Sequence, residues 1–236
     1  MTVSTLLHAH VLANDANSFI WWDWVGRHTD EIRQRAFEHL QQTLIAIGIG
    51  FTISLALSAV ALRFRWTFRP INALAGILYT IPSLALFAIL IPITGLSLLT
   101  AEIALVSYTL INLVPNIVTG IQSVPREVVD AADGLGMGSG GRFWKVEVPL
   151  AVPQIIAGLR IATVSTIGLV TITSFVGLGG GFGAFISDGR QRAFSTPLVL
   201  GVVGSVALAV VFDLAFVALG AALTPWRRGE RAGAAR

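Results

Sequence analysis

The chain has 236 residues, of which 54% are hydrophobic and only 12% charged, and its mean hydropathy is +0.76. A water-soluble domain could not keep so much apolar surface away from solvent, so the composition excludes that class. The net charge of +3 comes from sixteen basic residues, all arginine except Lys145, and these flank apolar stretches, which argues against nucleic-acid binding. The absence of cysteine excludes disulfides, thiolate metal sites and thiol catalysis.

The N-terminal part, residues 1–38, precedes the first long apolar stretch. It has neither a basic start nor a sustained apolar core, so we do not expect a cleaved signal peptide. Ile32, Ala36 and Leu40 fall four apart and predict a helix that lies at the outer surface and runs into the first span. The tryptophans at 21, 22 and 24 are typical of an interfacial belt, although a binding role for these aromatics stays open.

Five apolar stretches follow, at 39–62, 71–93, 97–120, 153–178 and 196–224. A bilayer-spanning helix needs roughly 20 apolar residues, and only such helices satisfy their backbone polar groups in lipid. The sequence therefore predicts an all-α membrane protein with about five transmembrane helices, a transmembrane domain over 39–224 and a basic tail over 225–236.

The arginines predict the orientation. Arg63, Arg65 and Arg69 crowd the first short loop, and the tail holds four more, at 227, 228, 231 and 236. With five spans these regions share one side, which the positive-inside rule assigns to the cytoplasm. The N-terminus is then outside and the C-terminus cytoplasmic, although Arg190 and Arg192 lie on the opposite side from the rule.

Prolines interrupt two spans. Pro82 and Pro92 fall within 71–93, and Pro115 lies between Asn112 and Asn116 in the third span. Proline frees backbone carbonyls that lipid cannot satisfy, so these segments should pack inside the bundle or line a cavity. Kinks that serve packing alone remain the alternative.

Residues 121–152 are too polar to cross a bilayer and would be cytoplasmic. Ser123 and Pro125 predict a helix start, and four apolar residues then follow the spacing of one helical stripe: Val128, Ala131, Ala132 and Leu135. Glycines then permit a turn, and a second short helix over 142–148 should end at Pro149. The stripe could dock on a partner or pack on this chain's own inner surface.

The stretch "DAADGLGMGSGGRFWKVEVP", residues 130–149, resembles the EAA loop of binding-protein-dependent ABC importer permeases. That pattern is Glu-Ala-Ala, three residues, Gly, nine residues and Ile-x-Leu-Pro; here Asp130 replaces Glu, and Val146 and Val148 replace Ile and Leu. The resemblance implies the type I permease fold and a coupling helix that docks on a separate ATPase subunit. It assigns this role to Glu127, Val128, Asp130, Ala131, Ala132, Leu135, Gly136, Phe143, Trp144 and Pro149.

The resemblance extends over about 38–224. "IPSLALFAILIPITGLS", "VPNIVTGIQSVPREVVDAADGLGM" and "SFVGLGGGFGAFISDG" are similar to permeases that import osmoprotectant quaternary amines: glycine betaine, choline, carnitine or proline. It implies an inner-membrane subunit with no cofactor of its own, whose partners are an ATPase pair that binds ATP and Mg, a second permease, an extracytoplasmic binding protein and lipid. Methionine-type permeases share the loop and are the alternative. The candidate pathway residues are Tyr79, Pro82, Ser83, Asn112, Asn116, Ser174 and Gly177.

Other classes of protein fit less well. The chain has no G-x-x-x-x-G-K-[ST] motif, so it does not hydrolyse ATP itself. An intramembrane enzyme would need acid/base or metal-binding groups within the spans, whereas all four histidines precede or begin the first span. A secondary transporter would favour several intramembrane carboxylates, and only Glu102 and Asp213 qualify.

Two charges lie deep in the predicted spans. Arg160 is seven residues into 153–178 and Asp213 is eleven from the end of 196–224, which places them about 10 and 16 Å from the same face. Isolated charges are costly there, so we expect the two to pair and fix the fourth span against the fifth. The alternative is that Arg160 extends toward the loop while Asp213 faces an aqueous cavity.

Overall fold

The computed structural model describes residues 19–226, and all regular structure within that range is helical. The four arginines of the tail, His8 and His10 lie outside the described residues. The elements are α2 (Trp22–Arg27), α3 (Thr29–Arg63), η1 (Arg65–Thr67), α4 (Phe68–Thr80), α5 (Ser83–Thr94), α6 (Leu98–Gln122), α7 (Arg126–Gly134), α8 (Ser139–Arg142), η2 (Phe143–Glu147), α9 (Val148–Thr173), η3 (Ser174–Val176), α10 (Phe182–Gln191) and α11 (Ser195–Leu223).

Four of these helices are long and apolar enough to cross a membrane. They are α3, α6, the continuous helix that includes α9, and α11, and they coincide with the first, third, fourth and fifth predicted spans. The prediction of an all-helical membrane protein with about five spanning elements is confirmed. The N-terminal helix is part of α3, whose 35 residues form one unbroken rod.

The second predicted span is not one straight helix. It consists of α4 and α5, which meet at a bend of 96°. Pro82 causes the break, because a proline forces the residue before it out of the helical region, and Ile81 is extended with ψ 124°. The hydroxyl of Tyr108 donates to the freed carbonyl of Ile81 at 2.5 Å. With 13 and 12 residues, neither piece alone spans the hydrocarbon core.

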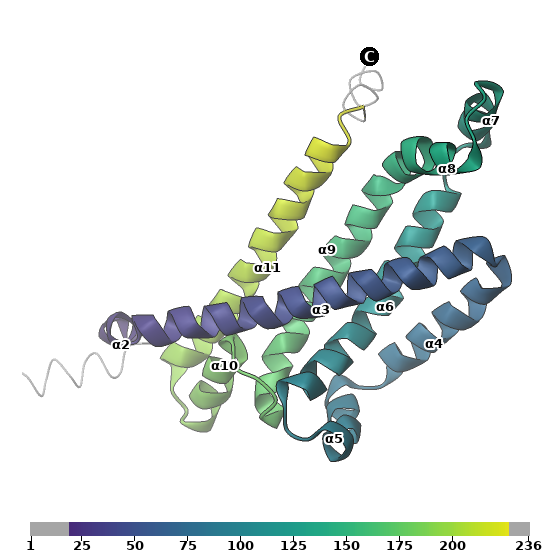
Figure 1. Cartoon of the computed structure of the whole chain (residues 1–236). Helices are drawn as coiled ribbons and strands as arrows, with labels where there is room; N and C mark the ends of the chain where they lie inside the picture. The colour runs from purple at the N-terminus through teal and green to yellow at the C-terminus, as the bar shows by residue number, and fades with distance from the viewer. Residues whose placement is uncertain (1–18, 227–236) are drawn as a thin grey trace, which may run out of the picture.

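The centre of the bundle is α6, which packs between α3 and α9 (Figure 1). Leu105, Leu113, Val114 and Val118 of α6 are fully buried. Small residues on the neighbours permit the close approach that membrane helices need. A Cβ at Gly158 of α9, for example, would lie only 2.6 Å from the Cβ of Asn116.

The two ends of the bundle differ in character. Figure 1 places α7, α8 and the C-terminal end of α11 at one end and α5 and α10 at the other. We call these the α7 end and the α10 end. Within the described chain, the last helix, α11, makes its main contacts with α9 and α10. None of its residues after Ser205 is buried. Its outward face is left for lipid or another subunit.

Candidate functional site

Residues 121–152 form a helical hairpin at the α7 end. The first helix, α7, begins at Arg126 with Pro125 before it, as expected. Ser123 was predicted to help start this helix, but its hydroxyl donates to the carbonyl of Gly120 and so belongs to the end of α6. The helix ends at Gly134, and Gly136, two residues later, has a φ of +77° that favours glycine. The amide of Met137 reaches back to the carbonyl of Ala132 at 3.1 Å, which completes a Schellman cap.

Arg142 clamps the two arms of this hairpin together. Its guanidinium donates to both carboxylate oxygens of Asp133 at 2.9 and 2.7 Å and to Glu147 at 2.8 Å. A planar guanidinium that binds two carboxylates fixes orientation as well as distance. Arg142 was not singled out in the sequence analysis. The available signal was its spacing: Arg142 lies nine residues after Asp133, across a glycine turn, and five residues before Glu147.

The apolar residues of the α7 stripe are partly buried against this chain and partly exposed. Ala132 is buried against this chain, as the alternative of packing on the chain's own inner surface expects for this side chain, and its coupling role stays a prediction. Val128 is 39% exposed and Leu135 is 79% exposed. Trp144 is 69% exposed and packs edge-on against Phe143, with ring centroids 5.2 Å apart. An apolar surface therefore projects from the α7 end; we call Val128, Leu135 and Trp144 the hairpin tip.

The remaining assigned residues surround this tip. Glu127, Asp130 and Ala131 are exposed on α7. Pro149 was expected to end a short helix, and that is wrong, because it lies in the first turn of α9 and the chain from Ser139 to Val176 is one continuous helix. A π-helical turn at Phe143–Glu147 precedes it, and its altered hydrogen bonding accommodates the missing proline N–H. The hairpin is thus rigidly joined to a spanning helix.

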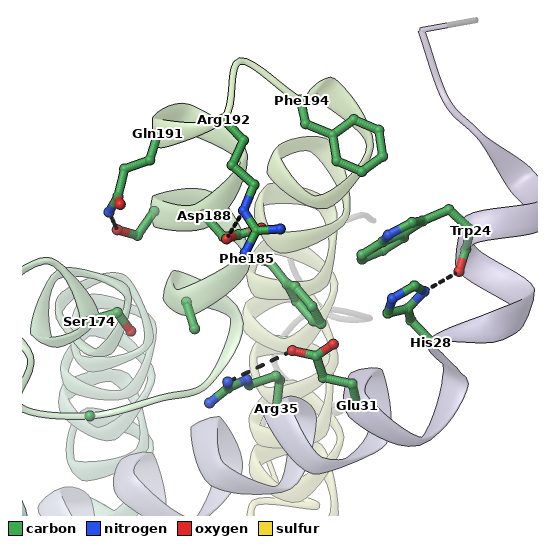
Figure 2. A pocket seen from close by; sticks show the side chains of 13 residues that line it. Trp24, His28, Glu31, Arg35, Ser174, Phe185, Asp188, Gln191, Arg192 and Phe194 are labelled. Atoms are coloured by element: carbon green, nitrogen blue, oxygen red, sulfur yellow. Dashed lines mark hydrogen bonds and ion pairs between the residues drawn. The ribbon is translucent and has the colours of Figure 1, made fainter. Parts of the chain in front are cut away.

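A polar pocket lies at the α10 end. This α3–α10 pocket has a volume of about 550 Å³ and is lined mainly by residues of α2, the start of α3 and α10 (Figure 2). Trp24 stacks on His28 at 3.9 Å and meets Phe194 edge-on at 5.6 Å, so the aromatic rings pack on one another. Two ion pairs line the walls: Glu31 with Arg35 at 3.8 Å and Asp188 with Arg192 at 2.7 Å.

The glycine-rich loop between α9 and α10 is fastened to α3. Glu38 accepts a hydrogen bond from the amide of Gly181 at 3.0 Å. His39 is fully buried; its Nε2 lies 3.1 Å from the carbonyl oxygen of Ile167 and its Nδ1 3.3 Å from the amide of Phe182. A Cβ at Gly181, where φ is +69°, would lie 2.9 Å from the Cβ of His39. The glycines therefore serve close approach between helix and loop.

The predicted pathway residues fall in three places. Tyr79, Pro82 and Ser83 are at the α4–α5 bend, where the Tyr79 ring meets that of Tyr108 at 5.6 Å. Asn112 and Asn116 are half-buried in α6; Asn116 donates to the carbonyl of Asn112 and accepts from Gln154 of α9. At the α10 end, Ser174 lines the α3–α10 pocket and Gly177 lines a neighbouring cavity of about 400 Å³.

Arg160 and Asp213 are brought together. The Nε of Arg160 donates to one carboxylate oxygen of Asp213 at 2.8 Å, and its second nitrogen to the other at 2.9 Å. The pair joins α9 to α11 near the middle of both helices. Within residues 19–226 no group of three or more His, Asp or Glu side chains could hold a metal ion.

The family model described as "Binding-protein-dependent transport system inner membrane component" matches residues 46–225. The chain belongs to this family. The permease is 33% identical over 195 residues to the choline transport system permease protein OpuBB of Bacillus subtilis, covering 83% of this chain and 89% of the relative. It is 34% identical over 194 residues to the osmoprotectant import permease protein OsmW of Salmonella typhimurium, covering 80% and 90%.

The fold of the permease is similar to that of a solved transporter. The structure titled as an inward-facing conformation of the MetNI methionine ABC transporter aligns with a TM-score of 0.70, covering 82% of this chain and 96% of that one at 20% identity. This likeness confirms the type I permease fold. The permease is accordingly a multi-pass inner-membrane transport component and not an enzyme, and it has no cofactor of its own.

Proposed function

We propose that the permease forms the translocation pathway of an ATP-driven importer for osmoprotectant quaternary amines such as glycine betaine, choline or carnitine. Support for the substrate class comes from the relatives, which are named for choline and osmoprotectant transport and align over most of their length. The methionine transporter shares the fold at 20% identity, which carries no argument about substrate.

The observation that carries the coupling role is the hairpin tip. Leu135 is 79% exposed in the segment between two spanning helices, so the permease itself leaves it uncovered. The Arg142 clamp holds the tip in one conformation. Exposed apolar side chains on a rigid hairpin are suited to binding in a groove of a partner protein. The partner in this proposal is the separate ATPase subunit, which binds ATP and Mg on the cytoplasmic side.

The complete importer would contain two permease subunits, the same or similar, an ATPase pair below them and an extracytoplasmic binding protein above. ATP binding draws the ATPases together, and the two hairpins move with them. Because each hairpin is continuous with a spanning helix, that movement reaches the bundle directly.

A substitution at the tip tests this proposal. Burying a leucine is worth about 1.5–3 kcal/mol, so Leu135→Arg should weaken association with the ATPase by roughly tenfold or more. Co-purification of the ATPase and its ATP hydrolysis in the complex should both collapse, while membrane insertion is unchanged. Phe19→Arg is a matched control, because Phe19 is 72% exposed and far from the hairpin tip in the sequence. Wild-type co-purification of the ATPase with the Leu135→Arg permease would exclude the tip as the docking site.

A further inference from the structure

The Arg160–Asp213 pair is open to the surroundings of the subunit. The Arg160 side chain is 39% exposed and that of Asp213 is 36% exposed, although both lie near the middle of membrane-spanning helices. A half-open ion pair facing hydrocarbon would be costly, and ionisable groups at this depth usually face a water-filled cavity or the interior of an assembly. A pair that served only to join α9 to α11 would gain from complete burial between them.

The surroundings of the pair suit a small solute. Phe216 lies three residues after Asp213, on the same face of α11, and its ring is 6.4 Å from that of Phe212. This part of the α9–α11 contact therefore presents a guanidinium, a carboxylate and a phenyl ring on neighbouring turns.

We propose that Arg160 and Asp213 form a contact site for a zwitterionic solute inside the membrane. A carboxylate of the solute would take the place of Asp213 on the guanidinium, where two parallel hydrogen bonds are available. Its quaternary ammonium group would lie between Asp213 and the ring of Phe216, since cations are attracted both to carboxylates and to aromatic faces. The exchange leaves no charge unpaired, because one internal pair becomes two pairs with the solute. This inference rests on the proposed function and specifies which permease residues read the solute.

The site makes a distinction that a structural ion pair does not. Glycine betaine carries both a carboxylate and a quaternary ammonium, whereas choline carries the ammonium alone. Arg160→Gln should therefore lower uptake of glycine betaine much more than uptake of choline, because choline can itself neutralise Asp213. The double substitution Arg160→Gln with Asp213→Asn removes both charges without leaving either unpaired, and it should lower uptake of both solutes.

The experiment uses the complete importer, with its ATPase and binding protein, in proteoliposomes containing ATP, and measures uptake of labelled glycine betaine and choline. We expect the choline-to-betaine uptake ratio to rise at least about tenfold in Arg160→Gln, and uptake of both solutes to fall at least about tenfold in the double variant. Complex assembly is measured by co-purification of all subunits. The matched control is Arg33→Gln with Asp30→Asn, which neutralises an arginine–aspartate pair that is 82% and 98% exposed on α3.

Three results would overturn the inference: wild-type uptake of glycine betaine by the double variant, an unchanged solute ratio in Arg160→Gln, or loss of assembly in both variants. The last would show that the pair only holds helices or subunits together. Failure of the unmodified importer to take up either solute would instead contradict the proposed substrate class.

Discussion

Replacement of His39 by leucine should destabilise the permease, because this side chain joins three helices. The amide of Phe182 and the carbonyl of Ile167 fix the imidazole as the Nε2–H tautomer, with Nδ1 accepting. The Phe182 amide is in the first turn of α10 and has no intrahelical acceptor, so the substitution leaves a buried donor unsatisfied. The Ile167 carbonyl still has its intrahelical partner and loses only one additional bond.

The loss of folding stability can be estimated from these two lost hydrogen bonds. An unsatisfied buried donor costs about 1–3 kcal/mol and a lost hydrogen bond about 0.5–1.5 kcal/mol, so His39→Leu should lower stability by about 1.5–4.5 kcal/mol. Leucine fills most of the same volume, so the cavity contribution is small. His39→Gln should recover part of the loss, since an amide provides both a donor and an acceptor.

Thermal unfolding of the purified permease complex measures this effect. For a chain of this size the apparent melting temperature should fall by at least about 3 °C in His39→Leu. Phe37→Leu, on the same helix but 64% exposed, is the matched control and should shift it far less. Equal melting temperatures for the two leucine variants would refute the assignment of His39 as the fastening of the glycine-rich loop.

Three further predictions use other parts of the bundle. Gly189→Ala should destabilise the permease by about 1–3 kcal/mol, because the new Cβ would lie 2.6 Å from a backbone nitrogen of α11. Gly168→Ala is the control, because its Cβ meets nothing within 4 Å and alanine favours a helix more than glycine does. The thermal unfolding measurement should show a lower melting temperature for the first variant and a higher one for the second. With an impermeant thiol reagent added outside cells, a cysteine at Leu96 should be labelled and one at Ser139 should not, and the reverse would invert the orientation inferred from the arginines. Glu102 is 7% exposed, and neither carboxylate oxygen has a hydrogen-bond partner among the described residues. The isosteric variant Glu102→Gln should therefore be at least as stable as the wild type. A lower melting temperature for this variant would show that the charged group makes a stabilising contact.

The spanning helices could be predicted from the sequence because lipid imposes a strong and local requirement. About 20 apolar residues leave a segment no alternative to a helix, so the positions of α3, α6, α9 and α11 followed from composition. The bend at Pro82 was only partly predictable. A proline predicts a break but not its angle of 96°, and the hydroxyl of Tyr108 that bonds to Ile81 at the bend lies 27 residues away in the chain.

In the candidate site, too, local sequence patterns were predictive, whereas features that depend on long-range packing were not. The spacing of the 130–149 motif located the hairpin, and two deep charges predicted the Arg160–Asp213 contact that the structure contains. The burial of Ala132 and the continuous helix through Pro149 could not be predicted, because each depends on how the arms of the hairpin pack. Contacts between Glu38 or His39 and the glycine-rich loop join residues about 140 positions apart, beyond the reach of any local pattern.

The unbroken helix from Ser139 to Val176 has a mechanical consequence. Its 38 residues make a rod about 57 Å long at 1.5 Å per residue. One end carries the Arg142 clamp and the other leads into the glycine-rich loop. If such a rod turns about its midpoint by about 10°, its ends move about 5 Å in opposite directions. A displacement of the hairpin would thereby be carried, by leverage, into an opposite displacement at the far end of the helix, because no break in the helix separates the two ends.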